Sequence, residues 1–237
     1  MLIKDKKHFN MGLMLAGSFA VILLLIFSPI FGGGKNGLQF SDDLFNKLAK
    51  GSSYFIPKLN EQVTKFDGTT VSTTFNIDKA EDVQRVAKIF MAAGAQVGAE
   101  GQAVTLNGDL GKILSSVLKD SDAMFKNDSD SVAARHGMDG REVLALQWNV
   151  LNKMDKELKK QKKIEESNIV NAVLRRAIEP SYNFYGIEAQ RVIDKAFTMI
   201  FLLVFYVVYT MWWGFAIFYM FEGMGLSMKK SKVKKEV

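Results

Sequence analysis

Two stretches without a charged residue decide the fold class of this chain. From Met11 to Phe31 the sequence reads MGLMLAGSFAVILLLIFSPIF, and from Ala196 to Phe221 it reads AFTMIFLLVFYVVYTMWWGFAIFYMF. A hydrocarbon layer about 30 Å thick requires about 20 apolar residues in a helix, because each residue advances about 1.5 Å. Both stretches are long enough to cross a bilayer, and we predict transmembrane helices over 11–31 and 196–221.

The first stretch follows three lysines and has an alternative reading as a cleaved secretory signal. The apolar core of a signal peptide is usually about 7 to 15 residues long, which is shorter than the uncharged run here. The end of the run, Ser28-Pro29-Ile30-Phe31, also lacks the small residues of a cleavage site. We interpret 11–31 as a retained membrane anchor.

The net charge of +6 is concentrated at the two ends of the chain. Lysines beside a membrane span favour the cytoplasmic side, so we predict a cytoplasmic N-terminus over 1–10 and a basic cytoplasmic tail over 222–237. The domain over 32–195 would then be extracytoplasmic, and the protein would lie in a bacterial inner (plasma) membrane. The tail lysines are also expected to contact anionic lipids. They are Lys229, Lys230, Lys232, Lys234 and Lys235.

The residue inventory excludes several kinds of site. The absence of cysteine excludes disulfides, thiol catalysis and thiolate-bound iron–sulfur clusters. Only His8 and His136 are present, and the expected topology puts them on opposite sides of the membrane, where they cannot share a metal. We expect His136 to lie in a loop. The acidic residues between Asp120 and Glu142 lack the glycine of a calcium loop, so we expect a solvated loop there.

The region between the two spans is predicted to be an α+β domain. Alternation of apolar and polar residues predicts a strand over 71–77, and helical spacing predicts a helix from Asp78 to Gly94. Two short strands over 96–98 and 103–106 follow, and then a helix over 110–118. The order strand, helix, hairpin, helix is most of a split βαβ unit, which makes the domain partially ferredoxin-like.

The rest of the domain has a purely helical pattern. From Gly140 apolar residues recur at helical spacing, and the polar segment 156–166 is either a free helix or the join between two antiparallel helices. Pro180 is expected to break the helix before the second span. Near the first span, Ser41 is expected to cap a short helix that Gly51 ends.

Both predicted spans carry features typical of contacts in a membrane. Small residues four apart predict a helix–helix interface formed by Gly12, Ala16 and Ala20, although chance also produces such a face. Rings at a spacing of four in the second span predict a groove for a partner subunit, a quinone or a lipid tail. They are Phe197, Phe201, Phe205, Tyr209 and Trp213. Simple lipid exposure is the alternative.

These patterns favour a protein without chemistry of its own. Neither predicted span contains an ionisable residue, which argues against proton or ion conduction. We find no motif for catalysis, a metal, a cofactor or nucleic acid, and we expect no enzyme activity. The prediction is an accessory or scaffolding subunit of an inner-membrane complex, whose partners are membrane lipids and other integral membrane subunits or further copies of itself. The alternatives are an extracytoplasmic sensing or binding module that signals to a membrane partner, and a self-assembling two-span regulator.

Overall fold

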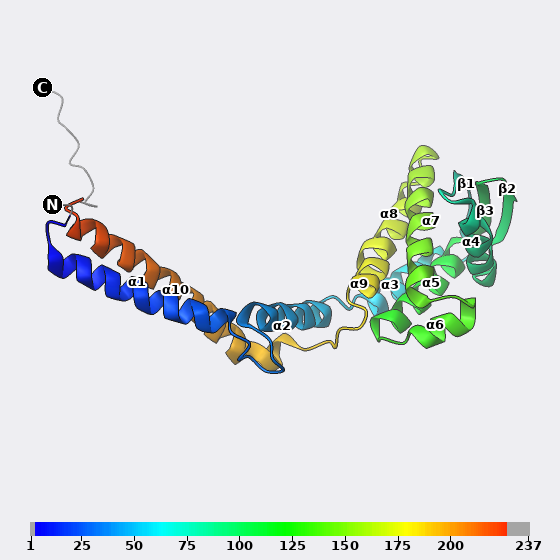
Figure 1. Ribbon diagram of the computed structural model, residues 1–237. Coiled ribbons are helices and arrows are strands. Elements are labelled where there is room, and N and C mark those ends of the chain that lie inside the picture. Colours follow the sequence, from blue (N-terminus) through cyan, green and yellow to red (C-terminus); the bar gives the residue numbers. More distant parts are fainter. Residues whose placement is uncertain (1–2, 227–237) are drawn as a thin grey trace, which may run out of the picture. The chain divides into compact units, whose positions relative to one another are not determined.

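The computed structural model describes residues 3–226 (Figure 1). The fold is mixed α+β, predominantly helical, with one small antiparallel sheet. The described residues form two compact units. One unit contains residues 3–45 and 191–226, and the other is Asn46–Gln190.

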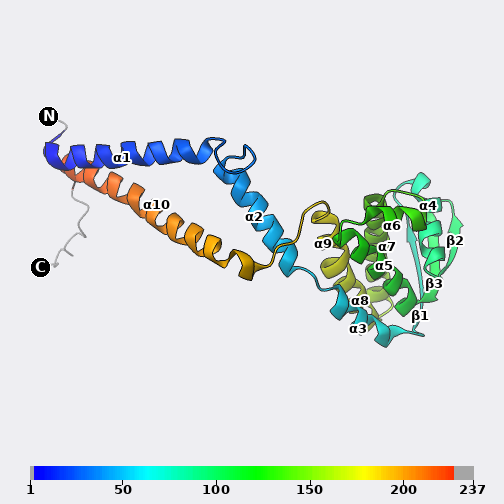
Figure 2. The same cartoon turned by 90° about the horizontal axis from the view of Figure 1, so that it is seen from below.

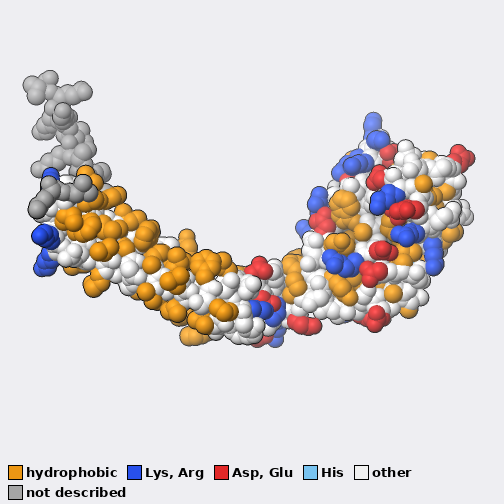
Figure 3. Space-filling view, in the orientation of Figure 1, with side chains coloured by type: hydrophobic (Ala, Val, Ile, Leu, Met, Phe, Trp, Pro, Cys, Tyr) orange, Lys and Arg blue, Asp and Glu red, His pale blue; other side chains and the backbone are white. Residues whose placement is uncertain are grey.

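The first unit contains two long apolar helices. Helix α1 spans Lys6–Phe27, and α10 spans Ala196–Gly223 after a 3₁₀ turn over Val192–Lys195. Both are long and apolar enough to cross a membrane, and the most apolar 18-residue window has a mean hydropathy of 2.2 in the first and 2.0 in the second. Figure 3 shows hydrophobic side chains over this pair of helices.

The ends of α1 differ from the expected 11–31 for local reasons. The helix begins earlier because the Asp5 side chain accepts hydrogen bonds from the backbone N–H groups of Lys7 and His8. It ends at Phe27 because Ser28 precedes Pro29 and adopts an extended conformation. The ribbons of α1 and α10 lie close together at the Lys6 end and separate toward the Phe27 end (Figure 2).

Helix α2 spans Gly37–Ser52 and begins earlier than the sequence pattern indicated. Asn36 and Gln39 form a reciprocal cap: the Asn36 side chain accepts from the Gln39 N–H at 2.9 Å, and the Gln39 side chain accepts from the Asn36 N–H at 3.0 Å. The expected cap at Ser41 is therefore wrong, because Ser41 lies inside the helix. Gly51 lies in its last turn.

The second unit begins within α2, at Asn46, and continues through α3 (Ile56–Val63) and a 3₁₀ turn (Thr64–Phe66) into the sheet. The strands are β1 (Thr70–Asn76), β2 (Gln96–Glu100) and β3 (Ala103–Asp109), and α4 (Ala80–Ala92) connects β1 to β2. The sheet order is β1-β3-β2, with β3 antiparallel to both neighbours. This is the strand arrangement of a split βαβ unit, and the described chain adds no fourth strand to this sheet.

One face of the sheet is buried and the other is polar. Val71 and Phe75 on β1 and Val104 and Leu106 on β3 point into the core, where α4, α5 and α7 pack against the strands. On the opposite face the hydroxyls of Thr74 and Thr105 hydrogen-bond across the strands at 3.0 Å. The alternation that predicted the strands reflects this two-sided environment.

Helices complete the second unit. They are α5 (Leu110–Phe125), α6 (Ser129–His136), α7 (Gly140–Lys160), α8 (Ile164–Val173), a π-helical segment (Leu174–Ile178) and α9 (Glu179–Asn183). The polar segment 156–166 is the join between α7 and α8, and Lys162 turns the chain with a φ of 61°.

Pro180 does not break the helix where the sequence suggested. The chain stays helical from Ile164 to Asn183, and the turn before the proline is widened into a π-helix, in which the Glu179 N–H donates to the Leu174 carbonyl. A π turn of this kind changes the register of the hydrogen bonds and tolerates a residue that lacks an N–H. The helix therefore presents Glu179 and Tyr182 on the side of α7.

Candidate functional site

The small residues predicted at a helix interface have different surroundings. Gly12 is buried against α10: a Cβ atom there would lie 2.5 Å from the Met220 nitrogen and 2.8 Å from the Ala216 oxygen. Ala16 is half-buried, and Ala20 is exposed. The contact of Gly12 lies within the chain, so that part of the predicted face is already occupied by α10.

The predicted ring stripe contributes to an apolar cavity of about 650 Å³ in the first unit. Phe201, Phe205 and Tyr209 line it together with α1 residues such as Ile22 and with Phe31. Tyr209 also stacks on Phe19 with ring centroids 4.2 Å apart.

The other two rings of the stripe lie elsewhere. Trp213 lies 4.7 Å from the Phe19 ring, between centroids, and Phe197 is 83% exposed. The cavity has an apolar lining suited to a hydrocarbon chain. The tail lysines Lys229, Lys230, Lys232, Lys234 and Lys235 lie outside the described residues.

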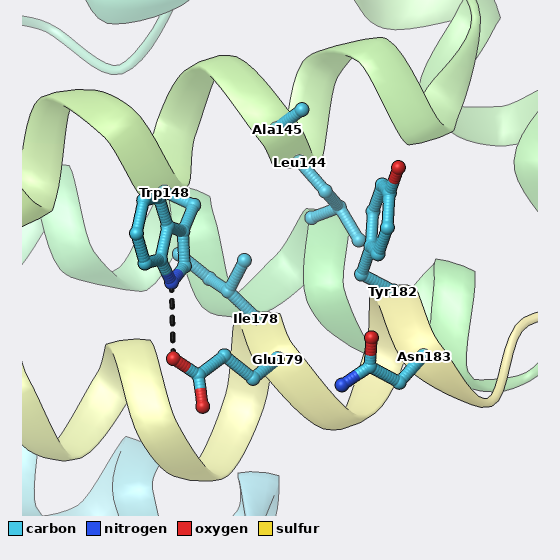
Figure 4. Close-up of a pocket in the computed structure, with 7 residues that line it drawn as sticks. All are labelled: Leu144, Ala145, Trp148, Ile178, Glu179, Tyr182 and Asn183. Atoms are coloured by element: carbon cyan, nitrogen blue, oxygen red, sulfur yellow. Dashed lines mark hydrogen bonds between the residues drawn. The ribbon is translucent and has the colours of Figure 1, made fainter.

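A second recess, of about 320 Å³, lies between α7 and α9 in the second unit (Figure 4). Leu144 and Ile178 are buried beneath it, while Trp148 and Tyr182 are 37% and 36% exposed. Figure 4 shows these two rings on opposite sides of Leu144 and Ile178. Ala145, Glu179 and Asn183 complete the lining. We call this recess the α7–α9 groove.

Hydrogen bonds hold the groove in shape. The Trp148 indole N–H donates to Glu179 Oε1 at 3.1 Å, and the Arg175 guanidinium donates to the same oxygen at 3.0 Å. At the other ring, the Arg141 guanidinium lies 4.9 Å from the centroid of Tyr182. A cation at this distance from a ring is attracted to its face. Both aromatic rings are therefore oriented by polar partners before any ligand binds.

A buried lysine joins the segments at the two ends of the second unit. Lys50, in the last turn of α2, is 2% exposed, and its Nζ donates to the Asn127 side chain at 2.9 Å and to the Ile187 carbonyl at 2.6 Å. Its ammonium also lies 5.1 Å from the Phe125 ring centroid. Burial lowers the pKa of Lys50, and the nearby Glu188 opposes that shift. This arrangement is suited to holding the end of α2 against the segments around Asn127 and Ile187.

The expected loop around His136 is wrong. His136 ends α6 and is buried, with its Nε2 2.9 Å from Asp120 Oδ2. Asp120 lies within α5 and also accepts from Gln147 at 2.7 Å and from Arg135 at 2.6 Å. Since this buried carboxylate is surrounded by donors from α6 and α7, we interpret the cluster as a structural joint between three helices.

Most of the acidic residues near this cluster are exposed to solvent as expected, but they lie on helices or at helix ends rather than in one loop. Asp128 and Asp139 are the N-caps of α6 and α7, and their side chains accept from backbone N–H groups of the first turns. Between residues 3 and 226, no group of three or more histidine, aspartate or glutamate side chains is arranged to hold a metal ion.

The α7–α9 groove is the site that the sequence pattern missed. Trp148 shares a helical stripe with Leu144 and Leu151, so it reads as a core residue, yet its ring is partly exposed. The available signal was Arg141 seven residues before Trp148, because an arginine on an apolar stripe marks its solvent edge.

Comparison with family models, with curated proteins and with solved structures found no match to this chain.

Proposed function

We propose that this chain is a non-catalytic accessory or scaffolding subunit of a larger inner-membrane complex. In this proposal α1 and α10 cross the bilayer, both termini are cytoplasmic, and the unit Asn46–Gln190 is extracytoplasmic. The observation that carries the proposal is the open apolar surface of the two helices. Only 6% of the most apolar window of each helix is buried. Apolar surface of this extent requires lipid or partner subunits around it.

The second unit supports a binding role more than a reaction. Its two buried carboxylates are both paired: Asp120 with groups from α6 and α7, and Asp155 with the Ser167 hydroxyl of α8 at 2.6 Å and with Lys159 of its own helix at 2.7 Å. Its most distinctive open feature is a recess with two oriented rings. Rings held in this way are typical of binding surfaces.

The membrane topology is tested by labelling. The chain has no cysteine, so Lys160→Cys in the domain and Ser231→Cys in the tail give single reactive positions. A membrane-impermeant maleimide should label Lys160→Cys in cells with a permeabilised outer membrane, and should label Ser231→Cys only after lysis. Labelling in the reverse order would overturn the orientation, and extraction of the protein by alkaline carbonate would overturn the spans.

The accessory role is tested by gentle extraction from native membranes. We expect the chain to migrate on a native gel with other integral membrane proteins, well above the 26.5 kDa of one copy. A monomer would contradict this role. A large assembly that contains this chain alone would favour the self-assembling regulator.

The α7–α9 groove favours one alternative, a sensing or binding module. A ligand that binds the folded domain raises its melting temperature, because binding removes folded protein from the unfolding equilibrium. A metabolite that stabilises the wild type and not a Trp148→Ala variant would support this alternative over the accessory role.

A further inference from the structure

Each ring of the α7–α9 groove has an arginine close to it or to its hydrogen-bond partner. Arg141 stacks on Tyr182, and Arg175 lies beside Glu179 and Trp148. Within residues 3–226, Arg175 is paired with Glu179, whereas Arg141 has no carboxylate at ion-pair distance. The Arg141 guanidinium therefore retains donors for a ligand carboxylate, in a position set by the ring beneath it.

The lining of the groove is mostly apolar, and its polar side-chain groups are those of Glu179, Asn183 and the two rings. Leu144, Ile178 and Ala145 offer no hydrogen-bonding side chain, and the Trp148 N–H is already used by Glu179. A sugar or a nucleotide needs several polar groups to orient it, and this recess supplies few of them. A large apolar side chain matches the recess better, because it removes its own surface and that of the two rings from water.

We propose that the α7–α9 groove binds a segment of a partner protein in which a large apolar side chain lies next to a carboxylate. The apolar side chain enters between Trp148 and Tyr182, and the carboxylate pairs with Arg141. Tryptophan, tyrosine and arginine are the residues most enriched at the energetic centres of protein interfaces. This inference rests on the proposed accessory function and names the chemistry by which the domain recognises its partner.

The probe for this proposal is a random library of 12-residue peptides displayed on phage, selected on the full-length protein in lipid nanodiscs. We expect the enriched peptides to contain Leu, Met, Phe or Trp within two positions of Asp or Glu. Enrichment of basic peptides, or no enrichment at all, would overturn the proposal.

A matched pair of variants at Ala145 tests the site itself. Ala145 is exposed and lines the groove, so a longer side chain there should leave the fold intact. Ala145→Glu and Ala145→Lys both place a long side chain in the groove, with opposite charge. An enriched peptide should bind Ala145→Glu at least tenfold more weakly than Ala145→Lys, measured by fluorescence anisotropy. Equal affinities would refute the charge assignment.

Two further variants separate ring from charge. Trp148→Ala should weaken binding at least tenfold, and Arg141→Gln should weaken it severalfold and reduce its salt dependence. Met91→Ala, an exposed apolar residue on α4 outside the groove, should leave the affinity unchanged. An equal loss in Met91→Ala would show that binding is not at the groove.

The groove and the accessory role can fail independently. If peptides select the groove but the chain is a monomer after gentle extraction, the accessory role fails and the groove stands. If the chain co-migrates with partners and Ala145→Glu leaves both that assembly and peptide binding unchanged, the groove proposal fails and the accessory role stands.

Discussion

Replacing Asp120 with alanine tests whether the buried polar cluster holds three helices together. Asp120 is 1% exposed and accepts from Arg135, His136 and Gln147 at 2.6 to 2.9 Å. Without the carboxylate, the buried groups of His136 and Gln147 have no partner in the cluster, and Arg135 loses its counter-ion. Breaking a buried charge pair from one side costs about 3–5 kcal/mol.

The expected loss corresponds to a large shift in melting temperature. For a domain of this size, 1 kcal/mol lowers the melting temperature by about 2–4 °C, so the shift should be about 6–20 °C. The assay is thermal unfolding of the full-length protein in detergent, followed by far-ultraviolet circular dichroism. Asp120→Asn, which keeps the shape and removes the charge, should fall between the wild type and Asp120→Ala.

The control is Asp130→Ala, at an exposed aspartate on α6. Exposed substitutions usually change stability by about 0.5 kcal/mol or less. If Asp120→Ala and Asp130→Ala melt within a degree or two of each other, the cluster does not stabilise the domain as we reason.

Two further predictions concern single positions. Gly12→Ile should separate α1 from α10 at a cost of about 1–3 kcal/mol, because its Cβ would overlap the Met220 backbone. Spin labels at positions 14 and 215 should move apart in Gly12→Ile. They should not move apart in Gly17→Ile, because nothing lies within 4 Å of a Cβ added at Gly17. Equal distances between the labels in the two variants would contradict the packing. Lys50→Met should change the pH dependence of stability. Because burial lowers the pKa of Lys50 in the folded state, the unfolded chain binds more protons than the folded one as pH approaches the ordinary value of 10.5. The stability of the wild type should therefore rise with pH across that window, relative to Lys50→Met. Urea unfolding from pH 7 to 10.5 measures this rise, and parallel curves would exclude it.

Local patterns predicted much of the secondary structure. The charge-free runs coincide with most of α1 and with α10, and the alternation over 71–77 coincides with β1. Such patterns depend only on which side of an element faces apolar surroundings and which faces polar ones, and the type of each residue indicates its side directly. The capping of α2 by Asn36 and Gln39 could have been predicted from residue types, but Ser41 and the two aspartates after it are also typical of a helix start.

The candidate sites were less predictable. His136 and Gln147 lie 16 and 27 residues after Asp120 in the sequence, and no periodicity indicates that three helices bring these side chains within hydrogen-bonding distance. Trp148 and Tyr182 lie on helices whose relative register depends on the π turn before Pro180. A proline alone indicates a break, and only the packing against α7 decides that the helix widens instead.

The amino-acid order by itself predicted two segments long and apolar enough to cross a membrane, and an intervening domain that mixes strands with helices. Those features follow from the transfer cost of each side chain, which is nearly independent of its neighbours. The tertiary structure alone decided that Gly12 packs within the chain, that His136 is buried against Asp120, and that two rings flank a recess between α7 and α9. These are contacts between residues far apart in the sequence, and they contribute to stability only after the helices have packed together.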